Sequence, residues 1–531
     1  MKCLCFPKTW LWPSSGKNKS QGARGSLTLI SVFVFFVFSA LGLGLIYLSQ
    51  AYLKLSAFKK NITLSDFSSE NGIKQGFAQL AGLASERRSP LILSEGYYQE
   101  LKQNSQGGGV KIAEEALSVH LPVQIEETWG GQAWSCSTQF LPTRFIESED
   151  YCLAEFHGEI RSKGRLKSSV YTRESSLEVC LKTLAGRIPL SYFPFLVTQN
   201  LDPARIRDFE EKHHIVFLPL STNQVSPTVS FSSLPLVPDE AGPLLTKALN
   251  IKIFSPEKLS TAELRAALGL EPTSDPIPQG VYLIKNDLGL GGVYVHGDIE
   301  EMVLAVQAGF QVVSFRLNAE RWVLRYNPAQ SQTQFATPTG TQNYDLVPLG
   351  IIMVNGRINS LGGGILDSSD QAVLVRNEEI PSILQGISLT IVSSDQTALS
   401  SHLIHQGLKW QNGIPYLKDS KSQLIVYSTG KDFLSDEDRQ GRIIIDANAP
   451  ADVKIQASLT ASDGFRVEGG GKTAFLIGGL QTSSLEMGEN TRKIAPDERL
   501  LTNSLAPQNS PVTTSPLLLI LGLIAVQWNE F

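Results

Sequence analysis

The longest apolar pattern in the chain covers residues 25–53. This run holds 29 residues without a charge, between Arg24 and Lys54. An α-helix rises ~1.5 Å per residue, and roughly 20 apolar residues cross a hydrocarbon core. The pattern therefore predicts a transmembrane helix over residues 26–53. The polar, Gly-rich remainder of the chain is expected on one side of that membrane.

The pattern becomes amphipathic after the apolar run. Ile73, Phe77, Leu80 and Leu83 recur at helical spacing, so one face of a helix is predicted to carry them. We expect a membrane-proximal amphipathic helix within residues 54–90. Residues 63–66 (TLSD) are typical of a capping box at a helix start.

Alternating apolar and polar positions dominate residues 110–198, as in residues 119–125 and 154–164. Period-two alternation predicts half-buried strands, and hence a β-rich head. Residues 199–275 show a different pattern, with short capped helices predicted at 202–212 and 260–269. We interpret that stretch as a mixed helical connector.

A repeated pattern follows in residues 276–531. The segment 292–302 (GVYVHGDIEEM) returns as 350–361 (GIIMVNGRINSL). Aligning the two copies pairs Val295, Gly297, Ile299 and Met302 with Val354, Gly356, Ile358 and Leu361, respectively. Fainter copies start at Leu389, Leu424, Arg442 and Ala474.

Short apolar strands at recurrent spacing, each followed by a polar turn, favour stacking because one repeat cannot bury its own apolar face. We therefore expect a β-solenoid, similar to a parallel β-helix. An irregular β-sandwich is the alternative. The apolar tail, residues 517–526, is too short to span a membrane, and we expect it to cap the solenoid end as a strand.

The composition favours a mainly β fold and gives no support for nucleic-acid binding. With 44 Gly and 27 Pro the chain is expected to be mainly β with some α. The net charge of −5 gives no reason to expect nucleic acid as a partner.

Charge sets the expected topology. Residues 1–25 form a basic leader with five Lys or Arg and no acid. Basic residues stay on the cytoplasmic side, so we expect a single-pass protein with its N-terminus in the cytoplasm and its body outside.

The junction at residues 23–31 (ARGSLTLIS) carries a family resemblance. A basic leader ending in Gly25, followed by Ser26 and an apolar helix, resembles the processing site of type IV pilin-like proteins, and most closely the PilX-type minor pilins. The resemblance implies that a prepilin-type peptidase cuts between Gly25 and Ser26. Other pilin-like subunits are then expected partners, in a bacterial inner membrane.

One position departs from the major pilins. They carry a Glu at the fifth mature residue, where this chain has Ile30, or Ser31 if the register slides by one. This departure argues against a subunit of a filament shaft.

Two further stretches extend the resemblance. Residues 154–164 are similar to the strand-turn-strand of a pilin-type head. The paired V-x-G-x-I-x-x-L repeats are similar to a bacterial domain of unknown function found behind PilX-type anchors. The resemblance thus implies a small α+β pilin-like head followed by the solenoid.

Candidate chemistry is sparse. If the head is exported, Cys136 and Cys152 can pair and close a loop of about 17 residues, which stabilises by ~3 kcal/mol in the chain-entropy model. His402 and His405 form an HxxH without the Glu of a zincin helix, so no metal site is predicted. We predict no cofactor, no catalytic residue and no small-molecule substrate.

The acids Asp298, Glu300 and Glu301 raise an alternative, because solenoids also host polysaccharide-acting enzymes. The second repeat has Arg357 and Asn359 where the first has Asp298 and Glu300, so no carboxylate pair recurs. We therefore expect a non-enzymatic component of type IV pilus or pseudopilus assembly that presents a solenoid surface. An envelope polysaccharide enzyme and an uncleaved structural envelope protein are the alternatives.

Overall fold

The structure is a computed structural model of the chain. It describes residues 24–85, 91–96, 98–99, 124–129, 132–147, 151–166, 172–199, 205–218, 229–232, 234–250, 260–367, 371–407, 409–411, 414–416, 421–486, 488–501 and 507–530.

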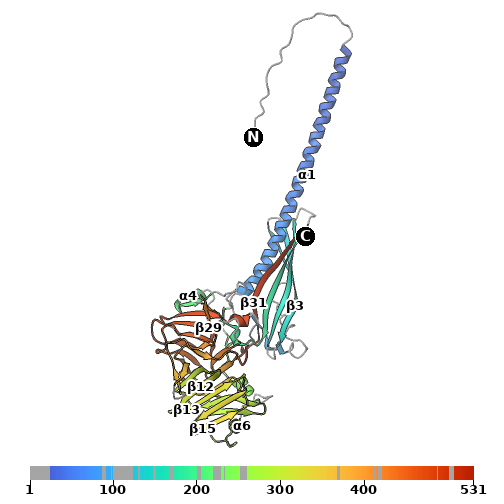
Figure 1. Cartoon of the computed structure of the whole chain (residues 1–531). Helices are drawn as coiled ribbons and strands as arrows, with labels where there is room; N and C mark the ends of the chain where they lie inside the picture. Colours follow the sequence, from blue (N-terminus) through green and yellow to red (C-terminus); the bar gives the residue numbers. More distant parts are fainter. Residues whose placement is uncertain are drawn as a thin grey trace.

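The described part of the chain is mainly β, and its first element is one long helix (Figure 1). Helix α1 (Arg24–Ser85) runs for 62 residues without a break. The expected transmembrane and membrane-proximal helices are thus a single element, and residues 63–66 are not a helix start. Thr63 lies inside the helix, where its Oγ1 donates to the carbonyl of Lys59, four residues earlier.

The second half of α1 packs on an antiparallel sheet, which we call the head sheet. Ile73 and Leu80 are fully buried there, with Phe77 beside them, as their helical spacing predicted. The sheet has the order β1 (Leu91–Ile92), β31 (Leu517–Glu530), β5 (Thr172–Gly186), β4 (Tyr151–Leu166), β3 (Gln132–Glu147) and β2 (Gln124–Trp129).

Two expectations about the head sheet were wrong. Residues 154–164 are not a strand-turn-strand, because β4 runs straight through them. The glycines in this stretch serve close packing: a Cβ on Gly158 would collide with Phe140, and one on Gly164 would collide with the α1 backbone. The tail does not cap the repeats either, since β31 pairs with β5 and β1 of the head sheet.

The remaining strands form two large sheets around one core. The first sheet has the order β7 (Ile215–Phe217), β30 (Thr491–Pro496), β29 (Thr473–Thr482), β27 (Lys454–Ala461), β25 (Gln423–Ser428), β20 (Ser388–Ser393), β16 (Ile351–Asn355), β10 (Gly289–His296) and β9 (Gly280–Asn286); β6 (Phe195–Val197) pairs with β29 and β8 (Val229–Phe231).

The second sheet lies opposite, with the order β15 (Gly340–Tyr344), β14 (Gln332–Thr337), β13 (Glu320–Asn327), β12 (Phe310–Leu317), β11 (Glu301–Gln307), β17 (Ile358–Leu366), β21 (Thr397–Leu399), β26 (Arg442–Ile445) and β28 (Gly464–Val467); β18 (Ala372–Leu374) pairs with β17. Two small pairs complete the β-structure: β19 (Pro381–Ile383) with β22 (Ile404–His405), and β23 (Lys409–Gln411) with β24 (Ile414–Tyr416).

The sequence repeat is a structural repeat. Each repeat contributes one strand to the first sheet and the next strand to the second. These strand pairs are β10–β11, β16–β17, β20–β21, β25–β26 and β27–β28. Within each sheet, the strand of one repeat lies parallel to the strand of the preceding repeat. Val295 lies opposite Val354, Ile299 opposite Ile358, and Met302 opposite Leu361, as the alignment of the two copies predicted. The fainter copies are the strands β20, β25, β26 and β29.

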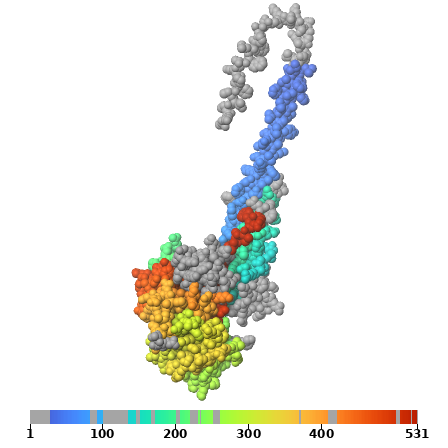
Figure 2. All heavy atoms as spheres, in the orientation of Figure 1, coloured from blue at the N-terminus to red at the C-terminus, as the bar shows by residue number. Residues whose placement is uncertain are grey.

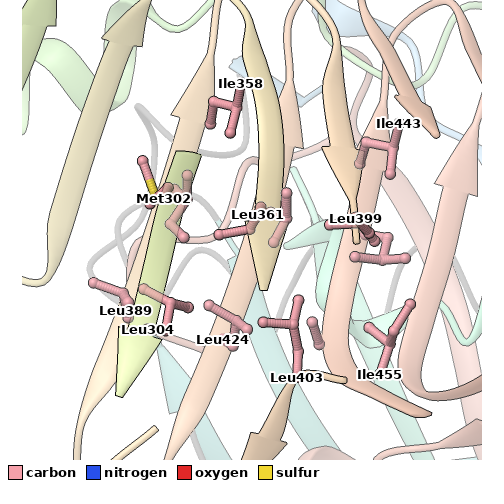
Figure 3. Close-up of a cluster of buried hydrophobic side chains, with 14 of the residues drawn as sticks. Met302, Leu304, Ile358, Leu361, Leu389, Leu399, Leu403, Leu424, Ile443 and Ile455 are labelled. Carbon is pink, nitrogen blue, oxygen red and sulfur yellow. The ribbon is translucent and has the colours of Figure 1, made fainter. Parts of the chain in front are cut away.

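Apolar side chains from successive repeats stack between the two sheets. Met302, Leu361 and Leu399 come from β11, β17 and β21 and lie side by side, all fully buried (Figure 3). A glycine is required in the turn as well, because a Cβ on Gly356 would collide with the carbonyl of Gly297 in the preceding repeat. We call the two large sheets, together with the turns between their strands, the stacked unit.

Short helices lie beside the stacked unit. They are η1 (Leu190–Tyr192), α4 (Ile206–Lys212), α5 (Gly242–Leu249), α6 (Thr261–Ala267) and α7 (Glu498–Leu501). Helix α6 has the predicted cap, since the Ser260 hydroxyl accepts from the Glu263 amide and the Glu263 carboxylate accepts from the Ser260 amide.

Candidate functional site

The first half of α1 is apolar and has no protein around it. It projects beyond the folded body, as Figure 2 shows. Leu29, Phe35 and Phe36 are each more than 70% exposed. Keeping a large apolar side chain in water costs roughly 1.5–3 kcal/mol relative to burial, so a row of them needs an apolar surrounding. Within the described residues, α1 is the helix long and apolar enough to cross a membrane.

The predicted processing residues lie where this helix begins. Gly25 and Ser26 follow Arg24 directly and belong to the first turn of α1. The apolar run starts in the same turn, so a cut between the two residues would leave the helix intact from its third residue onward.

Small residues line the seam where α1 meets the head sheet. Ser65, Ser68 and Ser69 are fully buried on the helix. The Ser69 and Ser175 hydroxyls are 2.7 Å apart and share a hydrogen bond. A side chain at Gly72 would collide with Ser162 and Trp134. Serine and glycine thus let the helix backbone approach the sheet closely, and they fix its position along the strands.

One ion pair joins α1 to the sheet at the exposed edge of this seam, and another lies on the far face of the sheet. The Arg173 Nε lies 3.2 Å from the Asp66 Oδ1 and joins β5 to the helix. On the opposite face of the sheet, Arg161 lies 2.7 Å from Glu159, and its hydrogen bond lowers the pKa of that carboxyl. Surface pairs of this kind contribute at most about 1 kcal/mol, so packing of the small residues dominates the seam.

The predicted Cys136–Cys152 bridge is not formed. Cys136 on β3 lies opposite Ser162, which is ten residues along β4 from Cys152. At ~3.4 Å per residue this separation is about 34 Å, whereas a disulfide needs Cα atoms within about 7 Å. Cys136 packs instead against Gly76 of α1, and burial raises the pKa of its thiol to about 11.

The acids that suggested an enzyme are engaged in structural contacts. The Asp298 carboxylate accepts the Arg357 amide of the next repeat at 2.8 Å. Glu300 and Glu301 both lie within 4 Å of the Arg316 guanidinium. These contacts join neighbouring repeats and strands.

A polar cluster that the sequence did not reveal lies on the outer face of the first sheet. Tyr294 and Asn355 come from β10 and β16, and the Asp432–Arg439 ion pair comes from the 430–440 loop. The Asn355 Oδ1 accepts the Phe433 amide, which holds the loop on the sheet. No local motif could reveal this cluster, because its members lie up to 145 residues apart.

Burial and hydrogen bonding have opposite effects on the pKa of the Asp432 carboxyl in this cluster. Burial alone would raise the pKa of Asp432, but the amides of Ser435 and Leu434 donate to its carboxylate, and Arg439 lies beside it. The pKa consequently lies below its ordinary value. Asp432 therefore acts as a charged brace of its own loop.

The two histidines of the HxxH pattern point to different neighbours. The His402 Nδ1 accepts the Lys454 amide at 3.0 Å, whereas His405 lines a small internal cavity. In the part of the chain that the structure describes, no group of three or more His, Cys, Asp or Glu side chains could hold a metal ion.

Comparisons with protein families, with curated proteins and with solved structures found no match.

Proposed function

We propose that the chain is a membrane-anchored, exported and non-enzymatic protein that serves type IV pilus or pseudopilus assembly as a minor pilin-like component. The observation that carries the proposal is the division of α1 into two halves. The first half exposes its apolar side chains, while the second packs on an antiparallel sheet. A subunit of this build can be held in a bilayer, or among other apolar helices, without disturbing its folded head.

The junction supports a pilin-like route to the membrane. The similarity of residues 23–31 to PilX-type processing sites falls on the first turn of α1, where Gly25 precedes Ser26. In this proposal a prepilin-type peptidase cuts there on the cytoplasmic face of a bacterial inner membrane, and the body lies outside the cytoplasm. Ile30 takes the place of the shaft-specific Glu, which favours an assembly role over a structural role in the shaft.

The stacked unit would then be the presented surface. We infer that it is a β-solenoid, since successive repeats add parallel strands in register to the same two sheets. The engagement of Asp298, Glu300 and Glu301 in contacts between repeats and strands supports a binding or structural role over polysaccharide chemistry.

N-terminal sequencing of the membrane-bound protein tests the proposal. The chain is expressed with its cognate assembly genes, and the Gly25→Leu variant is compared with Gly44→Leu, a matched change within the same helix. We expect a mature start at Ser26 in the wild type and in Gly44→Leu, and an uncut chain in Gly25→Leu. An intact leader in the wild type would overturn the pilin-like reading and support an uncleaved envelope anchor.

A further inference from the structure

A small cavity with polar and apolar side chains in its wall lies beside η1, the segment that follows the head sheet. Its wall includes Ser191 of η1, His405 of β22, Gln456 of β27 and the Asp497–Arg499 pair at the start of α7. Helix η1 follows β5 of the head sheet directly, and its Leu190 packs against Leu519 of β31. The cavity thus lies beside η1, the segment that leads from the head sheet into the stacked unit.

Four side-chain atoms on this wall are buried without a hydrogen-bond partner. They are both ring nitrogens of His405, the Nε2 of Gln456 and the Oγ of Ser191. The three residues are at most 3% exposed. A buried polar atom that lost its hydrogen bonds to water and gained none in return destabilises the fold, so four on one wall indicate an occupant.

The neighbouring charge is already neutralised. Arg499 donates to the Asp497 carboxylate through two nitrogens at 2.9 and 2.6 Å, and to the Ser422 carbonyl at 2.7 Å. Burial, with Arg499 nearby, lowers the pKa of His405 to about 3, so its imidazole is neutral at pH 7. A neutral imidazole offers one donor and one acceptor, Gln456 Nε2 is a donor, and a hydroxyl is both.

This set of donors and acceptors fits water. A cation in the cavity would be repelled by the neighbouring Arg499. An anion would lack a free positive partner, because Arg499 is already paired with Asp497. The space accommodates about one water molecule, and a buried water typically makes about three hydrogen bonds. We propose that an ordered water molecule occupies this cavity and bonds His405, Gln456 and Ser191.

The water would act as a brace at the joint. Residues 191, 405 and 456 come from three segments that are distant in the sequence. Their direct contact is a hydrogen bond from the His405 backbone amide to the Gln456 Oε1 at 2.9 Å. One water bonded to all three would tie η1 to β22 and β27. The brace would then help to hold the stacked unit at a fixed angle to the anchored head.

A crystal structure of the full chain in detergent tests this inference, at a resolution that shows ordered water elsewhere in the core. We expect one density peak about 2.7–3.2 Å from a His405 ring nitrogen and from Gln456 or Ser191. An empty cavity would overturn the inference, as would a peak at the ~2.0–2.1 Å distance of a zinc–nitrogen bond.

Two variants separate the water from its surroundings. His405→Leu should lose the density, and His402→Leu should keep it, because His402 bonds directly to the Lys454 amide. If His405→Leu does not fold, Gln456→Met replaces it and should lower the occupancy of the peak. Unchanged density in the chosen cavity variant contradicts the assignment.

Discussion

Gly164 of β4 lies so close to Ser65 of α1 that a methyl group on the glycine would collide with the serine carbonyl oxygen. The colliding atom belongs to the helix backbone, which cannot rotate away as a side chain can. The helix would have to leave the sheet to make room. Gly164→Ala should therefore lower the free energy of unfolding by about 1–3 kcal/mol, as overpacking typically does.

Gly82→Ala is the matched control for that change. Gly82 lies on α1, the helix that Gly164 contacts, and has open space where a Cβ would be. The new methyl group therefore meets no other atom, and helix propensity favours alanine over glycine by up to about 1 kcal/mol. Urea unfolding of both variants in detergent, followed by tryptophan fluorescence, should move them in opposite directions. Equal stabilities of the two variants would contradict the prediction and show that α1 can move away from the head sheet at little cost.

The internal repeat makes a second prediction. Leu361 is fully buried between Met302 and Leu399 of the neighbouring repeats. Leu361→Ala should cost about 2–5 kcal/mol, because the stacked side chains on both sides limit collapse of the cavity. Leu288→Ala, at a leucine that is 80% exposed, should change stability by less than about 0.5 kcal/mol. Thermal unfolding distinguishes the two, and a mild effect at Leu361 would mean that the core relaxes around the gap.

Sequence periodicity predicted the elements that depend on neighbouring residues. The apolar run, the buried helix face at Ile73 and Leu80, and the pairing of Val295 with Val354 all depend on local spacing or on a repeat. The structure confirms a helix over the apolar run, the burial of Ile73 and Leu80, and the pairing of Val295 with Val354.

The errors concern partners far away in the chain. Residues 517–526 form a strand, but their partner β5 begins 345 residues earlier, and no local pattern encodes that choice. The bridge between Cys136 and Cys152 looked feasible from a short loop, yet long antiparallel strands carry the two residues apart. The Tyr294 cluster and the His405 cavity likewise depend on contacts between distant segments.

The ion pair at the joint should be sensitive to the loss of one partner. Asp497 and Arg499 are less than 10% exposed and are joined by two hydrogen bonds. Arg499→Met should cost about 3–5 kcal/mol, since it leaves a buried carboxylate without its cation. Adding Asp497→Leu to that variant should recover much of the loss, because no buried charge then remains.

Arg442→Met is the control for the buried pair. Arg442 lies 2.7 Å from Asp463, but both side chains are about one-third to one-half exposed. Its loss should cost at most about 1 kcal/mol. Denaturant midpoints of the three variants provide the comparison, and similar losses for Arg442→Met and Arg499→Met would show that burial does not strengthen the pair.

His213 should make the protein less stable in mild acid. Burial, followed by the positive charges of Arg492 and Lys212, lowers the pKa of His213 from 6.5 to about 4. The unfolded chain therefore binds a proton at this residue below pH 6.5, while the folded chain does not until about pH 4. His213 therefore leaves the free energy of unfolding almost unchanged above pH 6.5 and lowers it by about 2 kcal/mol at pH 5. His213→Leu should reduce the difference in unfolding free energy between pH 7 and pH 5 by that amount. Urea titrations at the two pH values measure the difference, and an unaltered pH dependence in His213→Leu would mean that the buried imidazole already carries its proton in the folded state.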